Sequence, residues 1–168
     1  ARSVAGGTAV AMSKSPDVDT LVDLTRLGLD TVEEEAGHWL IGCNVRMQAL
    51  AEHEGLADLF DGLVCEAARA VGSQAIRHAV TVGGNLVQLY RWSDSPVAML
   101  ALGADLELTG PEGARWVAAD DFFAKHPRQT LREAEILTRV RIAKPEGRVA
   151  GSFIKYDSTA VDFAVVAA

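Results

Sequence analysis

Two short glycine pairs are the residues of this sequence best suited to chemistry. They lie in the segments Ala5-Gly6-Gly7-Thr8 and Thr81-Val82-Gly83-Gly84-Asn85, and each pair follows β-branched residues. This pattern predicts a strand that runs into a tight turn, because glycine tolerates φ > 0 and lets a ligand approach the backbone. Successive N–H groups in such a turn form an anion-binding nest. Two nests far apart in sequence suit a ligand with two adjacent phosphates, such as a dinucleotide. For either pair alone, an ordinary hairpin turn is the alternative.

The composition is that of a globular protein with a negative net charge. The chain has 168 residues, of which 49% are hydrophobic and 23% are charged, and its formal net charge is −7. Lysine and arginine form no cluster, so neither nucleic acid nor an anionic membrane surface is expected as a partner. The sequence has no apolar stretch that could span a bilayer and no signal-peptide pattern, which favours the cytoplasm.

The residues that commonly ligate metals or act as nucleophiles form no recognised motif. Cys43 and Cys65 stand alone and the four histidines are scattered, so we expect buried, reduced thiols and no metal site. The sequence contains no G-x-G-x-x-G, P-loop, G-x-S-x-G or H-E-x-x-H motif. These absences assign the chemistry to a bound cofactor, and no catalytic side chain is expected.

The elements around the glycine pairs alternate between helix and strand without regular βαβ spacing, which favours an α+β architecture. The expected elements are a helical turn over 9–14, a short strand over 21–24, a hairpin over 31–42, a helix over 45–53, an amphipathic helix over 56–71, a buried helix over 97–102, strands over 105–109, 115–117, 135–142 and 152–156, a short helix over 119–123, and a helix or strand over 161–168.

Capping residues mark where two of these helices begin. Asn44 is expected to cap the helix over 45–53, and Asp94 or Ser95 the buried helix that has Pro96 in its first turn. The second glycine pair is expected after a polar turn. Tyr90 and Trp92 could stack on a ring of a ligand, but core packing is favoured for both.

The order of these segments resembles the FAD-binding flavoprotein subunit or domain of the molybdenum hydroxylases, a family that includes carbon monoxide dehydrogenase medium subunits and xanthine dehydrogenases. The resemblance covers nearly the whole chain and is most specific at 81–85, with Asp94 nine residues beyond Asn85. Its other matching segments are 5–8, 21–24, 40–42, 74–86, 93–96, 121–123 and 152–155. It implies a two-subdomain FAD-binding fold of the molybdopterin dehydrogenase or vanillyl-alcohol-oxidase type.

The resemblance also implies how the chain is divided. Residues 1–42 would form part of an N-terminal FAD-binding subdomain, 43–150 a second FAD-binding subdomain and 151–168 the start of a C-terminal region. The family's leading βαβ segment and its C-terminal domain have no counterpart here, and the sequence ends on an uncapped apolar run. We therefore expect a fold truncated at both ends.

A set of FAD contacts follows from the resemblance. The expected cofactor-binding residues are Ala5, Gly6, Gly7, Thr8, Thr81, Gly83, Gly84, Asn85, Asp94 and Lys155. Both glycine turns would hold the diphosphate, Asp94 would accept a hydrogen bond from a ribityl or ribose hydroxyl, and Lys155 would lie near the flavin ring. The sequence departs from the family at Ala9, where an aspartate is common, and in the unusual segment 89–92.

The function implied is an electron relay. Substrate would be oxidised at a molybdopterin-bearing catalytic subunit, and an iron–sulfur subunit would pass the electrons to the FAD of this component and on to a terminal acceptor. Two alternatives remain at this point. One is a stand-alone FAD-dependent oxidoreductase, and the other is a non-enzymatic α+β interaction module whose glycine pairs are ordinary turns.

Overall fold

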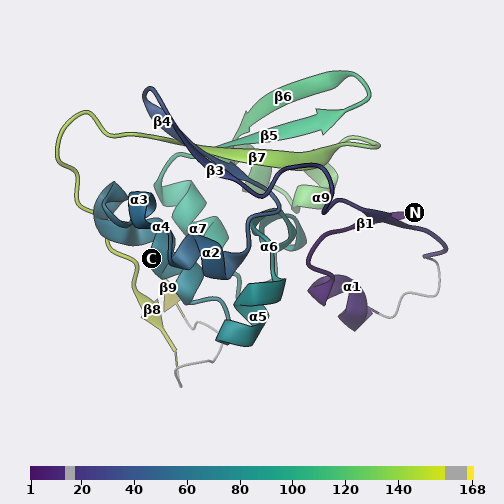
Figure 1. Cartoon of the computed structure of the whole chain (residues 1–168), viewed down its shortest axis with the longest axis horizontal. Coiled ribbons are helices and arrows are strands. Elements are labelled where there is room, and N and C mark those ends of the chain that lie inside the picture. The colour runs from purple at the N-terminus through teal and green to yellow at the C-terminus, as the bar shows by residue number, and fades with distance from the viewer. Residues whose placement is uncertain (14–17, 158–165) are drawn as a thin grey trace.

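A five-stranded antiparallel sheet with helices gathered on one face forms the body of the molecule (Figure 1). The computed structural model describes residues 1–13, 18–157 and 166–168. The strand order is β3-β4-β7-β5-β6. These strands are β3 (Val32–Glu35), β4 (His38–Gly42), β5 (Asp105–Gly110), β6 (Gly113–Ala118) and β7 (Ile136–Ala143). They confirm the predicted hairpin over 31–42 and the strands expected over 105–109, 115–117 and 135–142.

Side chains alternate between the two faces of this sheet, as the period-two pattern predicts. The inward residues are buried, and they include Trp39, Ile41, Leu106, Leu108, Val140 and Ile142. On the outward face, Asp105 lies opposite Arg141 and Glu107 opposite Arg139. Both pairs are ion pairs, with N–O distances of 2.8 and 3.6 Å. Opposite charges across neighbouring strands stabilise the pairing on the solvent side.

The helices are short. They are α1 (Thr8–Ser13), α2 (Met47–Ala51), α3 (Glu54–Ala57), the 3₁₀ helix η1 (Leu59–Gly62), α4 (Leu63–Arg69), α5 (Gln74–Ala79), α6 (Val82–Gln88), α7 (Ser95–Ala101), α8 (Ala119–Phe123) and α9 (Pro127–Thr130). The helical turn expected at 9–14 is α1, except that residue 14 lies outside the described residues. The predicted short helix over 119–123 is α8.

The prediction of a single amphipathic helix over 56–71 is wrong. Phe60 and Asp61 have left-handed φ values of 50° and 52°, which separate α3 from α4. The apolar stripe continues through the break because Leu56, Leu59 and Leu63 are all buried in the same core. Apolar periodicity reports which side chains face the core, so it does not reveal a backbone reversal between them.

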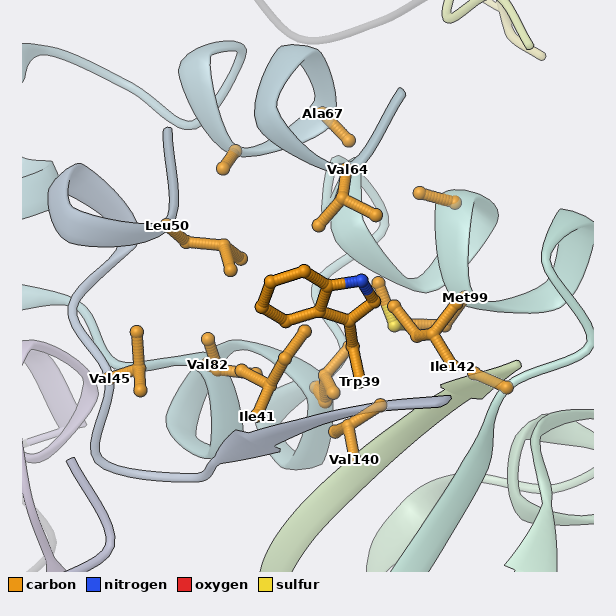
Figure 2. Packing of buried hydrophobic residues seen from close by; sticks show 14 of the residues in the cluster. Trp39, Ile41, Val45, Leu50, Val64, Ala67, Val82, Met99, Val140 and Ile142 are labelled. Carbon is orange, nitrogen blue, oxygen red and sulfur yellow. The ribbon is translucent and has the colours of Figure 1, made fainter. Parts of the chain in front are cut away.

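The core lies between the sheet and these helices, around Trp39 (Figure 2). The indole is surrounded by side chains from β4 and β7 on one side and from α2, α4 and α7 on the other, among them Leu50, Val64 and Met99. Gly55 leaves room for the ring, because a Cβ at that position would lie 2.5 Å from Trp39 Cη2.

A small parallel pair of strands stands beside the main sheet. Strands β1 (Arg2–Val4) and β2 (Leu21–Asp23) pair in parallel, and α1 lies between them in the chain. Asn44 joins this unit to the body, since its Nδ2 donates to the Leu24 carbonyl at 2.7 Å. The prediction that Asn44 caps a helix is therefore wrong, and α2 begins only at Met47, with Arg46 as its N-cap residue.

The last described elements are β8 (Lys155–Tyr156) and β9 (Val166–Ala167), which pair in an antiparallel manner. The strand predicted over 152–156 is thus limited to its last two residues. Most of the element expected over 161–168 lies outside the described residues. Since β3 and β4 share a sheet with β7, residues 32–42 pack with a strand formed by residues 136–143. The proposed subdomain boundaries at 42 and 150 stay a prediction.

None of the helices within 1–13, 18–157 and 166–168 combines the length and the apolar composition needed to cross a membrane.

An ion pair just before the start of β7 should make the fold sensitive to acid. Arg115 donates to both carboxylate oxygens of Glu135 at 2.8 Å, and the Arg132 N–H donates at 2.8 Å as well. The hydrogen bonds from Arg115, above all, lower the pKa of Glu135 from 4.5 to about 2. The folded state favours the ionised form of Glu135. The resulting contribution to the free energy of unfolding is therefore complete above pH 4.5 and is lost as the pH falls toward 2.

We expect the free energy of unfolding to fall by about 2 kcal/mol over that interval. Urea denaturation of the wild type and of Glu135→Gln at a series of pH values measures this. Glu135→Gln should have a lower free energy of unfolding than the wild type at neutral pH. That free energy should fall less on acidification in the variant. Parallel pH curves for the two proteins would contradict the assignment.

Candidate functional site

A cavity of about 1070 Å³ opens where the β1–α1 turn, helix α6 and strand β8 meet, and all ten predicted contact residues line it. They come from four separate stretches of the chain: 5–8, 81–85, Asp94 and Lys155. The volume slightly exceeds the usual range for small-molecule sites, roughly 300–1,000 Å³. The cavity is therefore large enough for an extended ligand rather than a small metabolite.

The first glycine pair forms the expected turn between β1 and α1. Gly7 has a φ of 74°, and its carbonyl accepts the N–H of Ala11 at 2.8 Å. Within the described residues, the backbone N–H groups of Gly6, Gly7 and Thr8 have no acceptor. Three successive N–H donors without acceptors, in a turn that lines a cavity, retain the capacity of an anion nest.

Gly6 is confined by the neighbouring backbone. A Cβ at Gly6 would lie 2.0 Å from the carbonyl oxygen of Ala79 and 3.1 Å from Nη1 of Arg46. Arg46 donates through Nη1 to the same Ala79 carbonyl. The first turn thus sits directly on the chain that leads into α6, and only glycine permits this approach.

The second glycine pair is not the turn that its sequence predicts. Gly83 and Gly84 lie in the first turn of α6, and the Thr81 side chain is the N-cap, accepting the N–H of Gly84 at 3.1 Å. The N–H groups of Val82 and Gly83 donate to the carbonyls of Val45 and Cys43 at 2.9 and 2.8 Å. The prediction of a strand leading into a nest is wrong here, because these donors already have acceptors inside the protein.

The two glycines of α6 serve different purposes. A Cβ at Gly83 would lie 2.7 Å from Cys43 Cβ and 3.1 Å from the Cys43 oxygen, so this glycine lets α6 pack closely on residue 43. A Cβ at Gly84 would approach only the Thr81 hydroxyl, at 2.9 Å. Gly84 is exposed, and because it has no side chain it leaves more room in the cavity beside α6.

Alanine substitutions should separate these two roles. Gly83→Ala should destabilise the fold by about 1–3 kcal/mol through overpacking. Gly84→Ala should leave stability nearly unchanged, because the gain in helix propensity of up to about 1 kcal/mol offsets a displaced cap. A β-branched residue at Gly84 should in addition narrow the cavity and abolish ligand retention with the fold intact. Thermal unfolding and ligand content of the variants test this, and full retention in Gly84→Val would contradict it.

A buried ion pair closes one end of the cavity. Asp94 is 3% exposed and accepts a hydrogen bond from Lys155 Nζ at 3.2 Å. Asp94 occupies the N-cap position of α7, and the predicted helix does begin there with Pro96 in its first turn, but neither side chain proposed as its cap acts as one. Burial raises the pKa of Asp94, and the neighbouring Lys155 opposes that rise.

Two buried oxygens in this region have no hydrogen-bond partner. Among the described residues, Asn85 Oδ1 and Asp94 Oδ1 are the buried side-chain atoms left without a donor. An unpaired buried acceptor costs about 1–3 kcal/mol, so such groups call for an explanation. Both residues line the cavity. A ligand that brings hydroxyl or N–H donors would satisfy both oxygens.

Cys43 also lines the cavity but is not suited to nucleophilic chemistry. It is 3% exposed, and burial raises the pKa of its thiol to about 11. The thiol is therefore protonated at neutral pH, in agreement with the expectation of buried, reduced cysteines.

Several cavity residues were missed or misplaced by sequence reasoning. Tyr90 and Trp92, expected in the core, line the cavity instead, and Trp92 is 39% exposed. Arg128, on α9, reaches the cavity and donates to Gln88 at 2.7 Å. The sequence carries no signal for these positions, since they depend on how α6, α7 and α9 are packed.

The comparison with known families identifies the family and its cofactor. Residues 1–145 match the family described as "FAD binding domain in molybdopterin dehydrogenase". The chain belongs to this family. The predicted α+β FAD-binding fold and FAD as the cofactor are thereby confirmed, and the match disfavours an interaction module with plain turns.

Individual relatives agree with the family. The carbon monoxide dehydrogenase medium chain of Afipia carboxidovorans is 33% identical over 172 residues, which cover 100% of this chain and 59% of the relative. The nicotinate dehydrogenase FAD-subunit of Eubacterium barkeri is 30% identical, with 90% of this chain and 53% of the relative covered. The chain therefore spans somewhat more than half the length of these curated relatives.

Solved structures show the same fold. The crystal structure of the Cu,Mo-CO dehydrogenase in its cyanide-inactivated form matches with a TM-score of 0.88 at 32% identity, over 99% of this chain and 59% of that chain. Quinoline 2-oxidoreductase from Pseudomonas putida 86 matches with a TM-score of 0.87 at 27% identity, with the same coverage of 99% and 59%.

Proposed function

We propose that the polypeptide carrying this sequence is the FAD-binding, electron-transferring component of a molybdenum-containing hydroxylase or dehydrogenase. Substrate would be oxidised at a molybdopterin centre on a catalytic subunit, and an iron–sulfur subunit would carry the electrons to this component. FAD, when bound, supplies the redox chemistry, since it takes up and releases electrons singly or in pairs. The related chains are named as medium chains or FAD subunits of such enzymes. A cytoplasmic location is part of this proposal.

The observation that carries the proposal is that all ten residues expected from the resemblance line one cavity in a member of an FAD-binding family. The cavity also offers both hydrogen-bond donors and hydrogen-bond acceptors that match the polar groups of FAD. In the part of the chain that the structure describes, the N–H groups of the first turn have no acceptors and would suit an anionic diphosphate. The buried oxygens of Asn85 and Asp94 are acceptors without donors for its hydroxyl groups.

Each residue of the set then has a proposed role. Ala5, Gly6, Gly7 and Thr8 would hold the diphosphate through backbone N–H groups. Thr81 and Gly83 would fix α6 against residues 43–45, and Gly84 would leave room for the cofactor beside that helix. Asn85 and Asp94 would accept hydrogen bonds from ribityl or ribose hydroxyls. Lys155 would hold the Asp94 carboxylate in place and put a positive charge near the flavin ring.

Elemental analysis of the native assembly tests the electron-relay proposal. The longest native form of the polypeptide is purified without dissociating its partners, and molybdenum, iron and FAD are measured per polypeptide. We expect all three to co-purify in a fixed ratio, with about one FAD per chain. FAD in the absence of molybdenum and iron would contradict the relay and favour the stand-alone FAD oxidoreductase.

A further inference from the structure

We propose that Arg46 is a positioning residue for the cofactor diphosphate and that it acts from behind the first glycine turn. The inference rests on the proposed function and adds to it a positive charge that is absent from the expected contact residues. Arg46 is half-buried and does not line the cavity. Its Nη1 lies 3.1 Å from the position that a Cβ of Gly6 would occupy, so the guanidinium lies directly against the turn.

The position of Arg46 is fixed by both its backbone and its side chain. The residue forms an antiparallel bridge with Thr81, the N-cap of α6, and the next N–H, that of Met47, donates to the Val80 carbonyl at 3.0 Å. The side chain donates through Nη1 to the Ala79 carbonyl. The guanidinium is therefore held between the chain that leads into α6 and the first turn, so little conformational freedom is lost when a ligand binds.

The charge of Arg46 is not neutralised by a neighbouring acid. Among residues 1–13, 18–157 and 166–168, no carboxylate forms an ion pair with it, whereas Arg139 and Arg141 each face one across the sheet. Taking a charge partly out of water costs free energy, which an opposite charge commonly offsets. In the same described part of the chain, the N–H groups of residues 6–8 have no acceptor. A bound anion would satisfy the cation and these donors together.

A positive charge at this position would act on one part of FAD more than on the others. The chain has a formal net charge of −7, which by itself repels an anionic diphosphate. A cation against the turn offsets that repulsion locally, and a partly buried charge is screened by salt less than an exposed one. The isoalloxazine and the ribityl chain are uncharged and gain little from it. Arg46 should therefore favour binding of FAD over binding of a flavin without phosphates.

Riboflavin, which lacks the diphosphate, separates this electrostatic role from a structural one. The longest native form of the polypeptide is freed of flavin, and its affinities for FAD and riboflavin are measured by calorimetry at low and at high salt. Arg46→Met removes the charge, and Arg46→Lys keeps the charge and a donor for the Ala79 carbonyl. Arg139→Met is the matched control, because Arg139 pairs with Glu107 on the outward face of the sheet and does not line the cavity. Circular dichroism verifies that each variant is folded.

We expect Arg46→Met to bind FAD roughly 10-fold more weakly at low salt and riboflavin as tightly as the wild type. Its FAD affinity should also fall less between low and high salt, because one of the attracting charges is gone. Arg46→Lys should recover most of the FAD affinity, and Arg139→Met should not differ from the wild type.

Two results would overturn the inference while the proposed function stands. One is an equal loss of affinity for FAD and riboflavin in Arg46→Met with an unchanged salt dependence, which would make the role of Arg46 purely structural. The other is an unchanged affinity for FAD in Arg46→Met. A wild type that binds no FAD would overturn the proposed function and the role of Arg46 together.

Discussion

Replacing Gly6 by valine should abolish FAD retention while the core remains folded. A Cβ at this position would lie 2.0 Å from the Ala79 carbonyl oxygen, so the first turn must move away from the chain that leads into α6. Its N–H donors would then no longer face the position that we propose for the diphosphate. Overpacking of this kind costs up to about 3 kcal/mol, which corresponds to a loss of roughly 100-fold in affinity.

The measurement is the FAD content of the purified full-length polypeptide, with its melting temperature as a check on folding. Gly37→Ala is a suitable control, because Gly37 has a φ of 92° in open space at the β3–β4 turn. That control should lose about 1 kcal/mol of stability through backbone strain and keep its FAD. Normal flavin occupancy in Gly6→Val would disprove the role of the first turn.

Asp94→Ala should weaken FAD binding and destabilise the protein at the same time. The substitution removes an acceptor for a cofactor hydroxyl and leaves Lys155, whose side chain is 15% exposed, without its carboxylate. Breaking one side of a buried ion pair costs about 3–5 kcal/mol. Loss of a hydrogen bond to a charged group would weaken FAD binding by about 1.5–3 kcal/mol, or roughly 10- to 100-fold.

Thermal unfolding with and without FAD separates these two effects. If Asp94 contacts the cofactor, the stabilisation that FAD confers should be smaller in Asp94→Ala than in the wild type. Lys155→Met provides a second variant, because it removes the ion pair but keeps Asp94 as an acceptor. An equal loss of stability in the presence and absence of FAD would show that Asp94 acts only within the protein.

The sequence was most informative where a local pattern decides the structure. The hairpin over 31–42 and the strands over 105–109 and 115–117 follow from alternation and turn residues, and β3–β6 match them closely. The glycine pair at 83–84 misled for a local reason. Two glycines after β-branched residues are typical of a turn, yet Thr81 caps a helix that contains them.

Other features depend on contacts that no local pattern encodes. Asp94 and Lys155 are 61 residues apart, and only the tertiary fold brings the first residue of β8 to the N-cap position of α7. The family resemblance placed both residues at the site, whereas periodicity and spacing gave no reason to pair them. Likewise, Trp92 lies in the loop after α6 and is 39% exposed, so the expectation of core packing was wrong for this residue.

The most direct test is the visible absorption spectrum of the longest native form of the polypeptide, followed by chromatography of the released flavin. The cavity and its unpaired oxygens predict about one FAD per chain, with a flavin spectrum that disappears when Gly6 is replaced by valine. A colourless protein that takes up no FAD when the cofactor is added would contradict the assignment of this cavity.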